Sequence, residues 1–234
     1  NDVNMIATIN PNTNKVLLTS IPRDYYVQLH GKTGYKDKLT HAGIYGINTV
    51  VQTIEDLFGI DINYYVRVNF TTVESLVNTI GPIEIYSDKA MSLDGCKYVV
   101  GTNTVNGKCA LRFARERHSY VEGDNHRIKN QQEVIKGIFN KLSKSAMVVT
   151  DYTSILDSLD GKFATNMDMK DITAFIKYEL EDITKYEILD TQVTGTGSME
   201  LTYSYPHQKL YVMFPSEQSV ESAKEYINKI SNEK

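Results

Sequence analysis

The residues best suited to chemistry gather in residues 112–132, RFARERHSYVEGDNHRIKNQQ, which are rich in cations within a chain of net charge −4. Arg115 and Arg117 are two positions apart, and in an extended segment this spacing puts both guanidinium groups on one face. Arg127 and Gln131 are four positions apart in the first turns of an expected helix, so they also share a face. Guanidinium groups suit phosphate because they donate hydrogen bonds in pairs and stay charged. The set therefore predicts an oxyanion site.

The same residues also fit a second interpretation, an ordinary solvated surface. For any one of these arginines the sequence leaves the two interpretations equally open, whereas the whole set at these spacings favours the anion site. The expected helix begins near Asp124, and a helix N-terminus attracts anions through its free N–H groups and its dipole. Asp124 or Asn125 can cap that helix, and Asp124 is expected to be a cap rather than a catalytic base.

Composition and charge indicate a globular, slightly acidic protein. The chain has 234 residues, of which 41% are hydrophobic and 23% charged, so it can bury a full core, and one domain is the expectation. The net charge of −4 argues against nonspecific binding to nucleic acid. No apolar run is long enough to span a bilayer, and the chain opens directly in strand-like sequence. We therefore expect that further residues precede this sequence in the protein.

The two cysteines, Cys96 and Cys109, are thirteen positions apart. They could be two buried thiols. In an extracellular protein they could instead form a disulfide, and closing a loop of about 15 residues would stabilise the fold by about 3 kcal/mol. Neither cysteine has the spacing to a second cysteine or histidine that indicates zinc.

The elements that must position these residues alternate between strands and helices, which predicts an α/β fold with a mixed central sheet between helical layers. Pro22 should end a strand and leave Arg23 and Asp24 at its end. Strands are expected as a hairpin over residues 1–21, in YYVRVNF and IEIYSD, over residues 109–116 as the strand of the arginines, and in TKYEILDTQV and KLYVMF. Helices are expected over residues 40–58, in VESLVNTI with Thr71 or Thr72 as its cap, after Asp124, over 150–159 and 169–180, and from about Ser216. Asn106 and Gly107 predict a tight turn.

Three blocks of this sequence resemble the LytR–CpsA–Psr family of bacterial cell-wall enzymes. They are NDVNMIATINPNTNKVLLTSIPRD, then KDKLTHAGIYG with LFGIDINYYVRVNF, and then ALRFARERHSYVEGDNHRIKNQQ. Their order and spacing match the family over residues 2–142. The arginine pattern after an alternating segment is the specific part of the resemblance, whereas PRD alone would be weak.

The resemblance implies a function and a location. Members of the family transfer a glycopolymer, a wall teichoic acid or a capsular polysaccharide, from a polyprenyl-pyrophosphate carrier to peptidoglycan, and they form a phosphodiester bond. Magnesium bridges the pyrophosphate, and a hydrophobic pocket between the sheet and its helices holds the lipid. An N-terminal helix anchors the catalytic domain on the extracellular face of the cell membrane. We therefore expect a single catalytic domain over residues 1–234 that lacks an upstream strand and the membrane anchor.

The resemblance also implies roles for individual residues. By position, the pyrophosphate ligands are expected to be Arg23, Lys38, Arg115, Arg117, Arg127 and Gln131. Asp2 matches the family's metal-binding aspartate, and Asp24 would orient Arg23. The catalytic set would be Arg23, Asp24, Arg115 and Arg117, with Asp2 or Asp24 taking the proton of an acceptor sugar hydroxyl.

The sequence departs from the family at two points. A second acidic metal ligand usually lies upstream of Asp2, where this sequence has no residues, and Ile128 stands where the family often has glycine. Arg23, Lys38 and Asp2 could each also be an ordinary surface charge.

Two rival functions remain open. The chain could be a non-catalytic module that binds polyprenyl phosphate or regulates capsule assembly, which the missing upstream acid keeps open. It could also be a nucleic-acid-binding regulator that uses the arginines, although its acidic charge and the lack of a recognition-helix signature count against this. Two histidines of the motif blocks, His41 and His118, are expected to be surface or hydrogen-bonded polar groups rather than catalysts.

Overall fold

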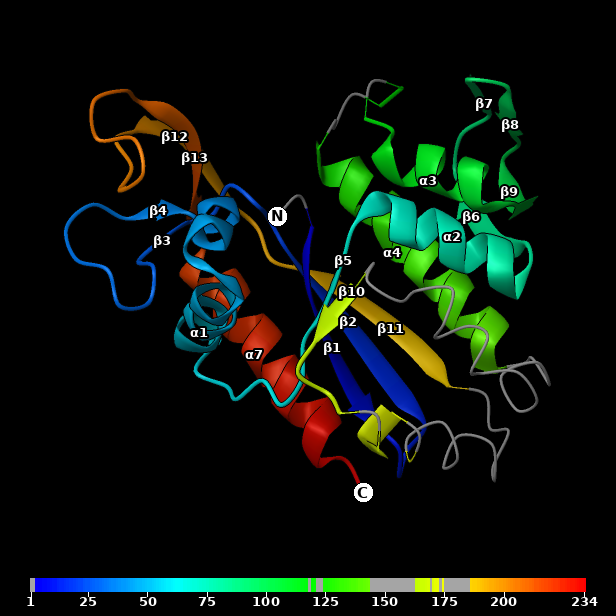
Figure 1. Cartoon of the computed structure of the whole chain (residues 1–234), viewed down its shortest axis with the longest axis horizontal. Coiled ribbons are helices and arrows are strands. Elements are labelled where there is room, and N and C mark those ends of the chain that lie inside the picture. Colours follow the sequence, from blue (N-terminus) through cyan, green and yellow to red (C-terminus); the bar gives the residue numbers. More distant parts are fainter. Residues whose placement is uncertain are drawn as a thin grey trace. The chain divides into compact units, whose positions relative to one another are not determined.

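The chain forms two compact units in the computed structural model (Figure 1). Unit 1 comprises residues 1–63 and 187–234, and unit 2 comprises residues 64–186. The structure describes residues 3–117, 119–120, 124–143, 163–168, 170–172, 174 and 186–234. Each unit has its own cluster of buried hydrophobic side chains. The single catalytic domain expected over residues 1–234 stays a prediction.

Unit 1 is built on a mixed three-stranded sheet. The expected hairpin is present: β1 (Asn4–Asn10) pairs antiparallel with β2 (Lys15–Ile21), with Asn4 opposite Ile21. On its other side β2 pairs parallel with β11 (Glu187–Gln192). Every residue of β2 after Lys15 is buried, as the apolar run in KVLLTSI requires of a central strand. Pro22 follows directly and ends this strand, as predicted.

Helix α7 (Glu217–Asn232) covers this sheet, and α1 (Ile47–Phe58) joins it in closing the core of unit 1. The C-terminal helix α7 contacts β1, β2 and α1, and it begins where predicted, with Ser216 as its N-cap. Asn10, at the end of β1, is a buried polar residue whose amide is hydrogen-bonded. Its nitrogen donates to the carbonyls of Ile230 and Glu233, at 2.7 and 2.8 Å. These carbonyls have no partner within the helix, so Asn10 satisfies the C-terminal end of α7.

The predicted helix over residues 40–58 is wrong in its first part. The structure has a 3₁₀ helix, η1 (Leu39–Tyr45), and α1 begins only after Gly46. Gly46 has φ 105°, a conformation that breaks the helix and favours glycine. Two short strands precede η1, β3 (Tyr26–Val27) and β4 (Asp37–Lys38), which pair antiparallel.

The last sheet of unit 1 contains one strand that the sequence did not predict. The expected strand in KLYVMF is β13 (Leu210–Pro215), and it pairs antiparallel with β12 (Gly195–Glu200). The sequence of β12, GTGSME, contains two glycines, which are typically depleted in strands. Here they allow close approach: a Cβ on Gly195 would lie 2.1 Å from the carbonyl oxygen of Phe214.

In the part of unit 2 that the structure describes up to residue 143, three helices pack with a pair of antiparallel strands. The helices are α2 (Phe70–Ile80), α3 (Gly107–Arg115) and α4 (Asp124–Ser143), and each contacts the other two. Helix α4 also packs on β6 (Ile83–Ser87), which pairs with β9 (Gly101–Val105). Two further strand pairs are β7 (Met91–Leu93) with β8 (Cys96–Tyr98), and β5 (Val66–Val68) with β10 (Phe163–Thr165).

The predicted strand of the arginines, residues 109–116, is wrong: it is helix α3. Its apolar residues follow a helical period, because Ala110, Phe113 and Ala114 are buried on one face. The expected tight turn at Asn106 is instead the N-cap of this helix, since its side-chain oxygen accepts from the N–H of Cys109 at 3.0 Å. Gly107 is required there, because a Cβ would lie 2.3 Å from the carbonyl oxygen of Glu74.

The remaining helix predictions differ in outcome. Helix α2 is present, but Asn69 is its cap rather than Thr71 or Thr72, since the Asn69 side chain accepts from the N–H of Thr72 at 2.8 Å. Helix α4 begins at Asp124 as predicted. The helix expected over 150–159 lies outside the described residues, and of 169–180 only 170–172 and 174 are described, all helical. Within the described ranges, no helix is long and apolar enough to cross a membrane.

Candidate functional site

The turn after β2 brings three of the predicted site residues together. Asp24 accepts a hydrogen bond from Lys38 Nζ at 2.9 Å and lies 3.5 Å from Arg23 Nε. The contact expected between Asp24 and Arg23 is therefore observed. Asp24 therefore contacts both cations, one through each carboxylate oxygen, an arrangement suited to holding Arg23 and Lys38 in place.

Backbone hydrogen bonds hold these residues in place. The N–H of Leu39 donates to the carbonyl of Tyr25 at 2.8 Å, and the N–H of Thr40 donates to that of Arg23 at 2.9 Å. The carbonyl of Asp24 accepts from the N–H of Met213, in β13, at 2.7 Å. The turn after β2 is thus fixed against the start of η1 on one side and against β13 on the other.

The sequence reasoning missed Asp37, a fully buried carboxylate beside this group. Its Oδ1 accepts from the N–H of Lys38 at 2.7 Å and contacts His41 Nδ1 at 2.6 Å. Its Oδ2 accepts from the N–H of Ser204 at 2.9 Å and from the Ser204 hydroxyl. Burial alone would raise the pKa of Asp37, but these hydrogen bonds from His41, Ser204 and the two N–H groups outweigh it and hold the pKa below its usual value.

An aromatic group holds the loop of Ser204 against η1. The hydroxyl of Tyr45, in η1, lies 3.0 Å from Ser204 Oγ, and the ring of Tyr45 contacts that of Tyr203 edge to face at 5.8 Å. The ring of Tyr205 lies 5.3 Å from that of His41. The four-residue spacing of Asp37 and His41 in KDKLTHA was visible in the sequence, but their partners lie more than 160 positions further along the chain.

In unit 2, Arg115 and Arg117 do not form the predicted same-face pair of a strand. Arg115 is the last residue of α3, and Glu116 already has extended backbone angles, φ −69° and ψ 132°. The guanidinium of Arg115 lies over the ring of Phe70, 5.0 Å from its centre, and both arginines are exposed. Their accessibility fits anion binding, but the geometric argument from an extended segment does not apply to them.

Arg127 and Gln131 both lie in α4, so their shared face is confirmed. Gln131 is only 6% exposed and Arg127 is half-buried. Two further amides of this turn region, Asn130 and Gln132, are also buried. The first turns of α4 therefore place several polar side chains inside unit 2.

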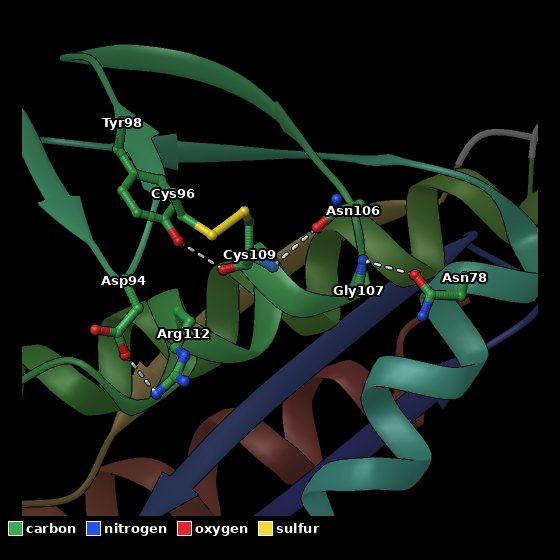
Figure 2. Close-up of a disulfide and its surroundings, with 8 residues drawn as sticks. All are labelled: Asn78, Asp94, Cys96, Tyr98, Asn106, Gly107, Cys109 and Arg112. Atoms are coloured by element: carbon green, nitrogen blue, oxygen red, sulfur yellow. Dashed lines mark hydrogen bonds and ion pairs between the residues drawn. A yellow bond between two sulfur atoms is a disulfide. The ribbon is translucent and has the colours of Figure 1, made fainter.

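A disulfide fixes the start of α3 (Figure 2). Cys96, in β8, and Cys109, in the first turn of α3, are bonded, with their Cα atoms 5.6 Å apart, which decides the alternative left open by the sequence. The hydroxyl of Tyr98 donates to the carbonyl of Cys109 at 2.7 Å, and burial raises the pKa of Tyr98 to about 12. Further along α3, Arg112 pairs with Asp94 at 2.9 Å. The helix that ends in Arg115 is thus held by covalent and ionic contacts to the β7–β8 hairpin.

The predicted metal ligand, Asp2, lies outside the described residues. Over the part of the chain that the structure describes, no group of three or more His, Cys, Asp or Glu side chains is placed to hold a metal ion. The donor set for magnesium therefore stays a prediction from the resemblance.

Comparison with known proteins decides the family. The model of the LytR_cpsA_psr family matches residues 1–226. The chain belongs to the LytR–CpsA–Psr family. The resemblance of the three sequence blocks is confirmed, and the match extends through the C-terminal third, where no motif was recognised.

Similar proteins support this assignment. A polyisoprenyl-teichoic acid–peptidoglycan teichoic acid transferase, TagU, from Enterococcus faecalis is 32% identical over 206 residues, which are 87% of this chain and 66% of that protein. The chain thus spans slightly less than two thirds of that relative. Among solved structures, the Lin1025 protein of Listeria innocua is 30% identical with a TM-score of 0.80, covering 100% of this chain and 93% of that one. Bacillus subtilis TagU is 27% identical with a TM-score of 0.76, at the same coverage. The predicted mixed α/β fold of the family is confirmed.

Proposed function

We propose that this LytR–CpsA–Psr chain is the transferase domain that moves a glycopolymer from a polyprenyl-pyrophosphate carrier to peptidoglycan, forming a phosphodiester bond. The observation that supports this most directly is the group of Arg23, Asp24 and Lys38, because it presents two cations held by one carboxylate. The E. faecalis relative is named for the same class of transfer.

In this proposal the protein positions charges and does no covalent chemistry of its own. An acceptor hydroxyl attacks the phosphorus on the glycan side, and polyprenyl phosphate leaves. Arg23 and Lys38 would bind the pyrophosphate and stabilise the charge that develops on the leaving phosphate. Asp24 would hold both cations in place, because its carboxylate contacts each of them. The roles of Arg115, Arg117, Arg127 and Gln131 as pyrophosphate ligands are part of the same proposal.

Magnesium, when bound, would neutralise part of the pyrophosphate charge, with Asp2 as a ligand. The position outside the cell membrane is also a proposal, and the Cys96–Cys109 disulfide supports it, because disulfides persist in oxidising compartments. An N-terminal membrane anchor and a choice between teichoic acid and capsular polysaccharide belong to the proposal as well.

The test uses Lys38→Ala and its neighbour Lys36→Ala as a matched control. Lys38 Nζ bonds to Asp24, whereas Lys36 is an exposed lysine two positions earlier. Purified chains would be mixed with a polyprenyl-pyrophosphate-linked oligosaccharide, peptidoglycan fragments and magnesium, and the phosphodiester product would be measured. Removing one donor to a developing charge typically lowers turnover by about 100-fold or more. We expect such a loss for Lys38→Ala and nearly normal transfer for Lys36→Ala, and equal rates for the two variants would contradict the role of Lys38.

A further inference from the structure

Asp37 fixes the hydrogen positions of its partners, because a charged carboxylate can only accept hydrogen bonds. The Ser204 hydroxyl must therefore donate to Asp37 Oδ2, which leaves Ser204 Oγ to accept from the hydroxyl of Tyr45 at 3.0 Å. In the same way, Nδ1 of His41 must carry the hydrogen that points to Asp37 Oδ1, over 2.6 Å. In the neutral ring of His41 the free lone pair is consequently on Nε2.

The position of His41 connects it to the charged group at the end of β2. His41 lies in η1, and its Nδ1 contacts the same oxygen, Asp37 Oδ1, that accepts from the backbone N–H of Lys38, the residue before this helix. The residue before His41, Thr40, is bonded through its N–H to the carbonyl of Arg23. His41 therefore follows directly on the backbone segment that is hydrogen-bonded to Arg23. Its side chain is 17% exposed, so solvent can reach part of it.

His41 and Asp24 differ in what their surroundings allow. Asp24 is bonded to one cation and faces a second, so both of its oxygens are engaged in holding Lys38 and Arg23. The charged or titratable groups that contact His41 are Asp37, from β4, and Tyr205, from the loop before β13. A buried carboxylate on Nδ1 orients the ring and stabilises the imidazolium that forms when Nε2 takes a proton.

We propose that His41 is the general base of the transfer reaction and that Asp37 is its positioning residue; this rests on the proposed function. The proton of the acceptor hydroxyl moves to Nε2 of His41 as the hydroxyl oxygen forms its bond to phosphorus. The bond from that phosphorus to the bridging oxygen breaks, and polyprenyl phosphate leaves with the electron pair. The imidazolium is held by Asp37 and returns its proton to solvent.

The deciding variant is His41→Asn. Asparagine places an amide nitrogen near the position of Nδ1, so it can still donate to Asp37, but it cannot take a proton from a hydroxyl. His207→Asn is the matched control, because His207 is an exposed histidine in the same loop region as Ser204. Each variant would be assayed for turnover across pH 5–9 and for binding of the polyprenyl-pyrophosphate substrate.

A general base supplies about 100-fold to 10,000-fold in rate. We expect His41→Asn to lose turnover by that factor while it still binds the substrate. A general base also makes kcat fall at acidic pH, and we expect this fall in wild type but not in His41→Asn. His207→Asn should behave as wild type. If His41→Asn does not fold, His41→Ala with added imidazole takes its place, and recovery of turnover is then expected.

Three outcomes would overturn the inference. Turnover of His41→Asn within tenfold of wild type would do so, as would a variant that keeps the acidic fall in kcat unchanged, or no recovery with imidazole in a folded His41→Ala. If wild type transfers no glycan at all, both the proposed function and this inference are contradicted. If wild type and His41→Asn both transfer glycan normally, only the role of His41 as the base is contradicted.

Discussion

Replacing Asp37 by asparagine should lower the stability of unit 1 strongly. Each carboxylate oxygen of Asp37 has two donors around it, and an asparagine can offer an accepting oxygen to only one pair. Its amide nitrogen would face the other pair, donor against donor, in a position with no access to water. Leaving buried partners of a charged group unpaired costs about 3–5 kcal/mol, so we expect Asp37→Asn to lower the free energy of unfolding by about that amount.

The effect should depend on pH in a defined direction. The pKa of Asp37 is lower in the folded than in the unfolded protein, where an aspartate has a pKa of about 3.9. The contribution of its charge to stability is therefore complete above the unfolded-state pKa and is lost as the pH falls through the folded-state value. The difference between wild type and Asp37→Asn should thus be largest near neutral pH and shrink below about pH 4.

Urea unfolding measures this difference. Circular dichroism is the suitable signal, because the chain contains no tryptophan whose fluorescence could report unfolding. Asp61→Asn is the control, because Asp61 is an exposed carboxylate of the same unit. The reasoning is refuted if Asp37→Asn costs less than about 1 kcal/mol, the size of one ordinary hydrogen bond, or if its cost does not change between neutral and acidic pH.

Two further predictions concern unit 2. Replacing both Cys96 and Cys109 by serine should lower the free energy of unfolding by about 3 kcal/mol, the value for a loop of about 15 residues. Thermal unfolding with and without a reductant measures this loss. If reduction left the melting temperature of wild type unchanged, the prediction would be contradicted. Gly107→Ala should cost about 1–3 kcal/mol, because its Cβ would meet the carbonyl oxygen of Glu74 at 2.3 Å and the backbone must shift. Gly95→Ala, at a glycine with open space around it but φ 86°, separates the two causes, since its cost can come only from backbone strain.

The sequence predicted those parts of the fold in which local pattern and burial agree. Four features follow from neighbouring residues, and the structure contains each of them. They are the apolar run of β2, the stop at Pro22, the long helix α4 and the start of the last helix near Ser216. The local pattern gave the wrong element where the same residues fitted both a strand and a helix. In residues 109–116 the alternation of arginines indicated a strand, whereas the spacing of the buried Ala110, Phe113 and Ala114 is helical, and packing on α2 and α4 decided for the helix.

The candidate site shows the same division. Arg23, Asp24 and Lys38 were predicted, and their contacts are present because short backbone links hold the turn after β2 against η1. The sequence could not identify Asp37 and His41 as an interacting pair. They are distinguished by the burial of Asp37 and by the hydrogen bonds that Ser204 donates to it. Such partners come from a loop at the far end of the chain, and no spacing rule connects them to residues 37–41.

The most direct test of the proposed function is transfer itself. Purified chain, a polyprenyl-pyrophosphate-linked oligosaccharide and peptidoglycan fragments would be incubated with magnesium, and the products would be identified by mass spectrometry. The proposal predicts peptidoglycan that has gained the oligosaccharide through a phosphodiester, with release of polyprenyl phosphate, and a large loss of both products in Lys38→Ala. A folded chain that binds the lipid-linked substrate but forms neither product would contradict it and would favour a module that binds the carrier without chemistry.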